Sequence, residues 1–147
     1  MRREVDIILA EDDNGHAFLI RSNLERAGIM NKVIHLKDGQ EVLDFLFMKG
    51  RDQNREEGKS YLILLDIRMP KIDGIEVLKE IKSDPELKKM PVVMISTSDN
   101  PDEIHMCHML GCNSYITKPI EYNKFVDTIR KLGMYLMIVE VPVTVPK

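Results

Sequence analysis

The sequence predicts an α/β domain in which helices cover both faces of a parallel five-stranded sheet. Five short apolar runs of strand character alternate along the chain with five segments whose apolar residues recur at helical spacing. Most of the strand-like runs are almost continuously apolar, which is typical of parallel strands buried on both faces. Right-handed crossovers through the helices then give a sheet between two helical layers.

The first two strand–helix units are expected before residue 51. Residues 7–10 form a buried strand, and the amphipathic helix after it ends at Gly28. Residues 32–36 form a weaker strand, and Asp38–Gly39 turns the chain into a second amphipathic helix. We expect that helix to end near Gly50.

The third unit is the centre of the pattern. Residues 51–59 contain no apolar residue and are expected to form a solvated loop. The strand that follows, residues 63–66, ends in Asp66, and Pro70 prevents a simple continuation of the ladder. Gly74 is suited to a positive φ in the tight connection to the third helix. An Asp–Pro pair disfavours continuation of that helix.

The last two units carry a clear helix start. Residues 92–95 form the fourth strand, after which Asn100 can cap a helix with Pro101 in its first position. Glu103 can reach back to complete a capping box. Residues 115–117 form a short fifth strand before the last amphipathic helix.

The composition argues against several classes of protein. Of the 147 residues, 44% are hydrophobic and 31% are charged, as expected for one ordinary soluble domain. A net charge of -3 argues against an electrostatic surface for nucleic acid. No charged segment followed by an apolar stretch opens the chain, so we expect a cytoplasmic protein without a membrane segment.

Several reactive side chains have no motif around them. Cys107 and Cys112 lack metal-ligand spacing, and we expect them to be reduced thiols. The histidines are singly placed and are expected to be ordinary surface or boundary residues: His16, His35, His105 and His108.

Polar side chains follow four of the predicted strands. They are two acids, Glu11 and Asp12, then Asp66, the hydroxyl of Ser96 and the cation Lys118. Because ligands of an open α/β sheet collect beyond the carboxyl ends of its strands, we expect these groups to converge on Asp66. Carboxylates brought together repel unless a cation neutralises them. An all-oxygen set favours Mg²⁺ over Zn²⁺.

Such a site suits phosphoryl transfer to Asp66. Its carboxylate can act as the nucleophile, while Mg²⁺ and the Lys118 ammonium compensate charge on the phosphoryl oxygens and Ser96 donates to a third. The resulting acyl phosphate adds a charge of about -1.5 to -2, enough to bias a two-state surface.

This pattern resembles the receiver domain of two-component response regulators. The likeness covers residues 5–132 and depends on a set of short motifs: Glu11-Asp12, Leu65-Asp66, Met69-Pro70, Asp73-Gly74, residues 91–96, Tyr115 and Lys118-Pro119. It implies a flavodoxin-like (βα)5 three-layer sandwich with strand order 2-1-3-4-5. By the same likeness, residues 1–133 are the receiver domain and residues 134–147 an apolar extension.

The resemblance also implies a role for each metal-side residue. Asp66 is the phosphoacceptor, and Glu11 and Asp12 are the acids that hold Mg²⁺, or Mn²⁺, together with Asp66. Arg68 contributes its backbone carbonyl to the metal. Its long side chain departs from the smaller polar groups frequent there, and it either shields the acyl phosphate or points to solvent. Asp13 lies outside the acidic pair and is predicted to be a helix cap.

On the other side of the site, Lys118 is implied to contact the phosphoryl group, and the Lys118–Pro119 bond to be cis. Ser96 and Tyr115 resemble the switching hydroxyl and aromatic residue. Ser96 stands where threonine is commoner, which keeps the hydroxyl and loses a methyl group.

The narrower likeness is to stand-alone receivers that partner phytochrome-type histidine kinases. It depends on the loop at residues 51–59, the segment 91–98 and the apolar tail. It implies a sensor histidine kinase as partner and a homodimer through the C-terminal region. The tail, too short for a bilayer span of about 20 residues, packs on its own domain or on a second copy. Either the fifth helix runs through Gly133 to about Leu136, or an edge strand begins earlier.

Two other functions are compatible with this fold. An aspartyl-phosphate phosphatase also uses a nucleophilic aspartate, but it is expected to carry an acid/base aspartate two residues later, where this chain has Arg68. A receiver-like docking module would not accept phosphate at all. The intact set of Glu11, Asp12, Asp66 and Lys118 favours the phosphorylated switch.

Overall fold

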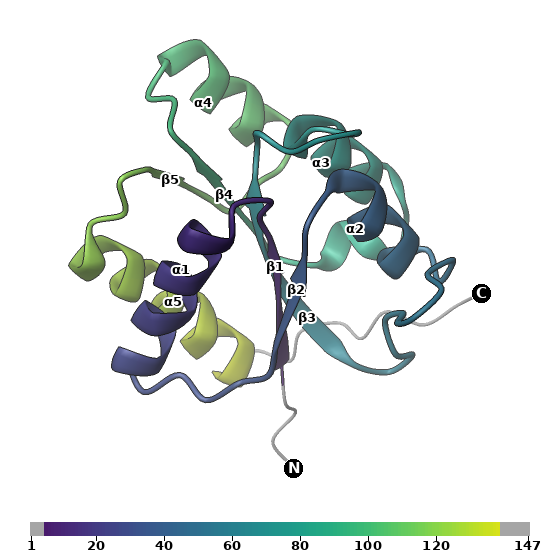
Figure 1. The fold of residues 1–147 in the computed structure, drawn as a ribbon, viewed down its shortest axis with the longest axis horizontal. Helices are drawn as coiled ribbons and strands as arrows, with labels where there is room; N and C mark the ends of the chain where they lie inside the picture. The colour runs from purple at the N-terminus through teal and green to yellow at the C-terminus, as the bar shows by residue number, and fades with distance from the viewer. Residues whose placement is uncertain (1–4, 139–147) are drawn as a thin grey trace.

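The computed structural model describes residues 5–138 and contains, within them, one parallel sheet of five strands (Figure 1). The strands are β1 (Val5–Ala10), β2 (Val33–Leu36), β3 (Ser60–Asp66), β4 (Val92–Ser96) and β5 (Ser114–Thr117). The helices are α1 (Asn14–Arg26), α2 (Gly39–Leu46), α3 (Gly74–Ser83), the short 3-10 helix η1 (Leu87–Lys89), α4 (Pro101–Met109) and α5 (Tyr122–Ile138). The sheet order β2-β1-β3-β4-β5 confirms the predicted flavodoxin-like fold.

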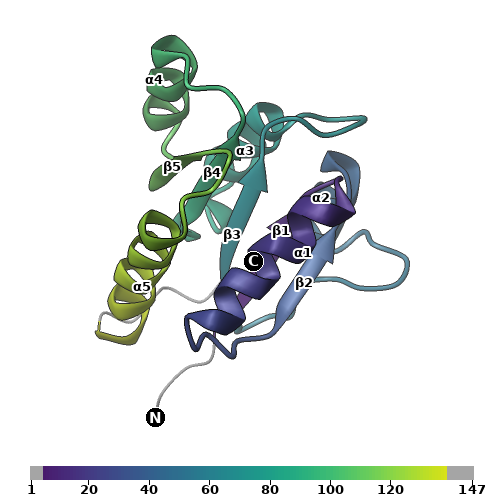
Figure 2. The ribbon, with the colours of Figure 1, turned by 60° about the vertical axis from the view of Figure 1, so that its left-hand side comes forward.

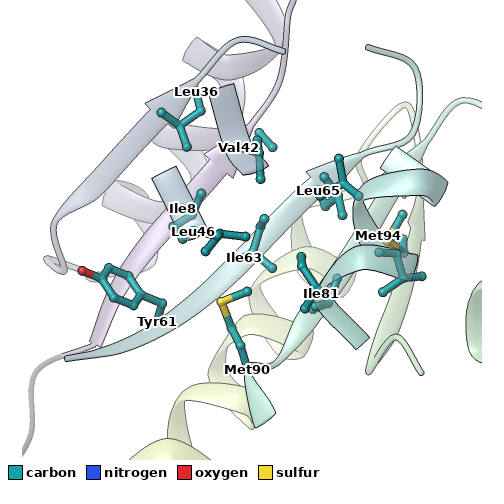
Figure 3. Close-up of a cluster of buried hydrophobic side chains, with 14 of the residues drawn as sticks. Ile8, Leu36, Val42, Leu46, Tyr61, Ile63, Leu65, Ile81, Met90 and Met94 are labelled. Atoms are coloured by element: carbon teal, nitrogen blue, oxygen red, sulfur yellow. The ribbon is translucent and has the colours of Figure 1, made fainter. Parts of the chain in front are cut away.

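Two hydrophobic cores hold the helices on opposite faces of the sheet (Figures 1 and 2). Successive strand residues point to opposite faces, so β1 directs Ile8 to one core and Leu9 to the other. Helices α1 and α5 cover the face that buries Phe125. Helices α2 and α3 cover the other face, whose core is drawn in Figure 3 around Ile63 and Leu46. The nearly continuous apolar strands are explained by this burial on both sides.

The register of the sheet aligns the ends of its strands. Ala10 at the end of β1 pairs with Leu65 in β3, and Asp66 pairs with Ile95 in β4. Ser96 in turn pairs with Thr117 at the end of β5. The polar residues that end or follow these strands therefore lie along one edge of the sheet.

The loop before β3 differs from the prediction. Helix α2 ends at Leu46 rather than near Gly50, because Met48 takes a left-handed conformation with φ of 59°. The predicted solvated loop was wrong for Arg55, which is buried and donates from Nε to the Leu46 carbonyl at 2.6 Å. A long side chain thus returns to satisfy a carbonyl that the helix end leaves without a partner.

Gly74 is required for a different reason from the one predicted. Its φ is not positive; the left-handed residue in this connection is Lys71, with φ of 69°. A Cβ on Gly74 would instead lie 2.2 Å from the Asp66 carbonyl oxygen and 2.8 Å from Ile67 Cα. The start of α3 is therefore packed directly on the backbone of the residue that ends β3.

The start of α4 confirms the cap but not the capping box. The Asn100 side chain accepts from the Asp102 amide at 2.9 Å, and Pro101 is the first helical residue. Glu103 does not reach back to Asn100, because its carboxylate accepts from the Tyr115 hydroxyl at 3.1 Å.

Helix α5 settles one of the alternatives for the tail. It runs without a break through Gly133 to Ile138, so the helix continues past the predicted domain boundary. The rest of the apolar tail, residues 139–147, lies outside the described residues. Within the described part of the chain, none of the helices is both long and apolar enough to cross a membrane.

Candidate functional site

Three carboxylates lie together at the carboxyl edge of the sheet. Glu11, Asp12 and Asp66 each offer an oxygen, and these atoms all lie within 4.8 Å of one another. Glu11 and Asp66 are buried, with 1% and 4% of their surface exposed, whereas Asp12 is exposed. Glu11 is fixed at the end of β1 by its amide, which donates to the Leu36 carbonyl at 3.0 Å.

The Lys118 ammonium reaches into this cluster from the end of β5. Its Nζ lies 2.5 Å from Glu11 Oε1 and 3.3 Å from Asp66 Oδ2. The backbone amide of Lys118 donates to the Ser96 carbonyl at 2.6 Å, and the Lys118–Pro119 bond is cis. The predicted convergence of acids and cation is therefore present in the structure.

Negative charge exceeds positive charge in the cluster. Burial raises the pKa of Glu11, and its hydrogen bond with Asp66 raises it further, while Lys118 acts in the opposite direction. One ammonium thus does not fully compensate three carboxylates. The donor set consists of oxygens only, which fits Mg²⁺ or Mn²⁺ and is poorly suited to Zn²⁺.

Arg68 turns its side chain away from the carboxylates. Its backbone amide donates to Asp66 Oδ1 at 3.3 Å, so the loop after β3 folds back over the Asp66 carboxylate. The guanidinium lies 3.9 Å from Glu103 Oε2 on α4, and 69% of the side chain is exposed. Of the two predicted orientations, the structure has the exposed one, directed along the surface towards α4.

Ser96 and Tyr115 are linked through the loop between β4 and α4. Ser96 is fully buried, and its Oγ accepts from the Ser98 amide at 3.1 Å. The single O–H of Tyr115 is shared between two acceptors, the Ser98 carbonyl at 2.8 Å and Glu103 Oε1 at 3.1 Å. Burial raises the pKa of Tyr115, and the neighbouring Glu103 contributes to the rise. The hydroxyl and the aromatic residue therefore hold the same loop from its two sides.

One residue of the site was missed by the sequence analysis. His16 is an exposed side chain, as predicted, but its Nδ1 lies 3.1 Å from Lys118 Nζ and 3.7 Å from Glu11 Oε1. The predicted cap explains its place, because the Asp13 side chain accepts from the His16 amide at 2.9 Å and fixes the first turn of α1. The one signal in the sequence was its position in the first turn of the helix that follows β1, the strand whose end forms the site.

Comparison with known proteins places the site in context. The profile of the response regulator receiver domain matches residues 7–130. The probable methanogenesis regulatory protein FilR2 of Methanothrix harundinacea is 36% identical over 132 residues, which cover 88% of this chain and 81% of that protein. The response regulator Rcp1 of Synechocystis is 40% identical over 112 residues, covering 76% of this chain and 75% of Rcp1.

Solved structures agree with these relatives. A response regulator receiver domain from Rhodospirillum rubrum superimposes with a TM-score of 0.79 at 40% identity, covering 96% of this chain and 99% of the other. The phosphorylated cyanobacterial phytochrome response regulator RcpA gives 0.74 at 34% identity, covering 96% and 98%. The Mn²⁺-bound form of Rcp1 gives 0.73 at 34% identity, covering 98% and 99%.

Proposed function

The chain belongs to the response regulator receiver domain family, and from this premise we propose that Asp66 accepts a phosphoryl group from a histidine kinase. The observation that carries the proposal is the Lys118 ammonium, which lies within 3.3 Å of both Glu11 Oε1 and Asp66 Oδ2. A buried lysine beside an acceptor carboxylate supplies the charge that a transferring phosphoryl group needs.

We propose that Glu11, Asp12 and Asp66, with the backbone carbonyl of Arg68, hold Mg²⁺ or Mn²⁺. Bound there, the ion neutralises charge on the carboxylates and on the transferring phosphoryl group. The excess negative charge in the cluster supports this proposal. Similarity to Rcp1, which has been solved in a Mn²⁺-bound form, also supports it.

In the transfer step, an Asp66 carboxylate oxygen forms a bond to phosphorus as the bond from phosphorus to the kinase histidine nitrogen breaks. The leaving imidazole keeps the electron pair of that bond. Lys118 donates to a phosphoryl oxygen, and the product is an acyl phosphate on Asp66.

The proposed switch acts through Ser96. To donate to a phosphoryl oxygen, its hydroxyl must move towards Asp66, which alters the contact of Oγ with the Ser98 amide. Tyr115 holds the carbonyl of the same Ser98, so the loop and the surface of α4 respond together. A protein partner that recognises this surface would receive the signal.

The proposed upstream partner is a sensor histidine kinase of phytochrome type. Similarity to the phytochrome response regulator RcpA supports this. We also propose a cytoplasmic location, contact with neither nucleic acid nor membrane, and a homodimer through residues 134–147.

The test is incubation with acetyl phosphate and Mg²⁺, with intact-mass spectrometry as the readout. One added phosphoryl group on the wild type and none on Asp66→Asn would support the switch. Continuous release of phosphate in many turnovers would favour the aspartyl-phosphate phosphatase instead. No adduct with acetyl phosphate, or with a phosphorylated histidine kinase, would favour a docking module.

A further inference from the structure

Three groups surround the Lys118 ammonium among the described residues: Glu11, Asp66 and His16. The ammonium has three N–H donors, and the three acceptor atoms lie at 2.5, 3.3 and 3.1 Å from Nζ. We propose that His16 is a positioning residue for Lys118, which keeps the ammonium at the acceptor while its two acidic partners change during phosphoryl transfer. The proposal rests on the proposed function of Asp66.

The imidazole accepts its hydrogen bond through Nδ1. Lys118 is a cation with no acceptor of its own, so Nδ1 must carry the lone pair at 3.1 Å. In this contact His16 therefore accepts through a ring nitrogen, whereas Glu11 and Asp66 accept through carboxylate oxygens.

This difference matters during the reaction. Phosphorylation converts the free carboxylate of Asp66 into an acyl phosphate, and Glu11 belongs to the set that would hold the metal ion. Both acidic partners of Lys118 thus have a second task that weakens their hold on it. His16 has no such task, and it can keep one N–H of the ammonium while another turns to a phosphoryl oxygen.

The histidine is held on a rigid part of the fold. Asp13 caps α1 at the His16 amide, and the next residue, Ala17, is buried in the core beneath α1. Lys118 comes from the loop between β5 and α5. The contact therefore ties the Lys118 ammonium to a helix whose position is set by packing rather than by the charges of the site.

The loss of this acceptor should slow phosphoryl transfer by about fivefold, the rate equivalent of one ordinary hydrogen bond. The variant His16→Ala removes the acceptor. The variant His16→Asn restores it, because the amide oxygen of asparagine occupies the same position along the side chain as Nδ1. The exposed His105, on α4, provides the matched control His105→Ala.

The experiment measures the rate of adduct formation from acetyl phosphate at saturating Mg²⁺ and a mildly alkaline pH. We expect His16→Ala to be about fivefold slower, and His16→Asn and His105→Ala to stay close to the wild type. Equal rates for His16→Ala and the wild type, or a slow His16→Asn, would overturn the proposal.

A second measurement does not depend on phosphorylation. In ¹H–¹⁵N spectra of the lysine ammonium groups, the Lys118 signal should shift in His16→Ala and return towards the wild-type position in His16→Asn. An unchanged signal would reject the contact even if transfer were slow for another reason. If the wild type formed no adduct but the Lys118 signal still shifted in His16→Ala, the phosphoacceptor role of Asp66 would be rejected and the His16–Lys118 contact would be supported.

Discussion

The Tyr115 hydroxyl donates to Glu103 Oε1 across 3.1 Å and so ties the β5 strand to helix α4. The other oxygen of the same carboxylate faces Arg68 at 3.9 Å. Glu103 therefore connects Arg68, two positions after Asp66, with Tyr115, the aromatic residue of the proposed switch. Neither neighbour is close to Glu103 in the sequence.

Removal of this link should destabilise the protein modestly. In Glu103→Ala the Tyr115 hydroxyl keeps its bond to the Ser98 carbonyl, so we expect a loss of about 0.5–1 kcal/mol in the free energy of unfolding. Urea denaturation of Glu103→Ala, Tyr115→Phe and the double variant measures the coupling. If the losses of Glu103→Ala and Tyr115→Phe were strictly additive in the double variant, the two side chains would not act together. Asp102→Ala is the control, and its loss should be additive with that of Tyr115→Phe.

Arg68 should slow the hydrolysis of the acyl phosphate. Its exposed guanidinium can leave the weak contact with Glu103 and approach the new dianion, where it obstructs attacking water. We expect phosphate loss to be several-fold faster in Arg68→Asn than in the wild type, measured after removal of the phosphodonor. Equal rates would show that the side chain stays at α4.

The carboxylate cluster should make stability depend on divalent metal. In EDTA, Asp66→Asn should be at least as stable as the wild type, because it removes a negative neighbour that raises the pKa of Glu11. Mg²⁺ at about a hundred times its dissociation constant should stabilise the wild type by about 2.7 kcal/mol and the variant much less. Asp13→Asn keeps a capping residue outside the cluster and should retain the full effect. An equal effect of Mg²⁺ on Asp66→Asn would place the ion elsewhere.

Gly74→Ala should be among the most damaging single changes. The new Cβ would meet the Asp66 carbonyl oxygen at 2.2 Å, and backbone cannot give way cheaply, so we expect a loss of about 3 kcal/mol or more. Gly28→Ala is the matched comparison: its φ is +78° but nothing lies within 4 Å of the Cβ, and about 1 kcal/mol of strain is expected. Similar thermal midpoints for the two variants would contradict this.

Cys112 should make stability fall in alkali. Burial raises the pKa of its thiol to about 11, from an ordinary value of 9.0. Between these two values the folded protein holds the proton more tightly than the unfolded chain, so the contribution is intact below about pH 9 and declines as pH rises to about 11. The free energy of unfolding should decline by about 3 kcal/mol over this range, and Cys112→Ala should lack this decline. If the free energy of unfolding, measured by urea denaturation, depended on pH in the same way in the wild type and in Cys112→Ala, this effect would be excluded.

Much of this site follows from local patterns in the chain. Strand β3 ends in a polar residue, and polar residues follow β1 and β5 directly. Because parallel strands place such ends on one edge of the sheet, the convergence of Glu11, Asp66 and Lys118 could be predicted from the sequence. The cap at Asp13 was predictable for the same reason, because capping involves residues only about three apart.

The contacts that were not predicted join elements distant in the sequence. His16 meets Lys118 only because α1 begins beside the loop after β5, and Glu103 meets Tyr115 only because α4 lies along β5. In the sequence Arg55 is not distinguishable from other charged loop residues, and its burial follows only from the contact of the loop with the end of α2. Close approach of two backbones, as at Gly74, leaves no signal distinct from that of a turn glycine.

The place of β3 in the sheet order has a consequence for local unfolding. β3 is bonded on one side to β1 and on the other to β4, whereas β2 and β5 each have a single neighbour. Amide hydrogens of the edge strands should therefore exchange with solvent through small openings that leave β3 intact. We expect β3, which carries the proposed phosphoacceptor Asp66, to be the last strand to lose its protection, so that opening of the edge strands does not displace this residue.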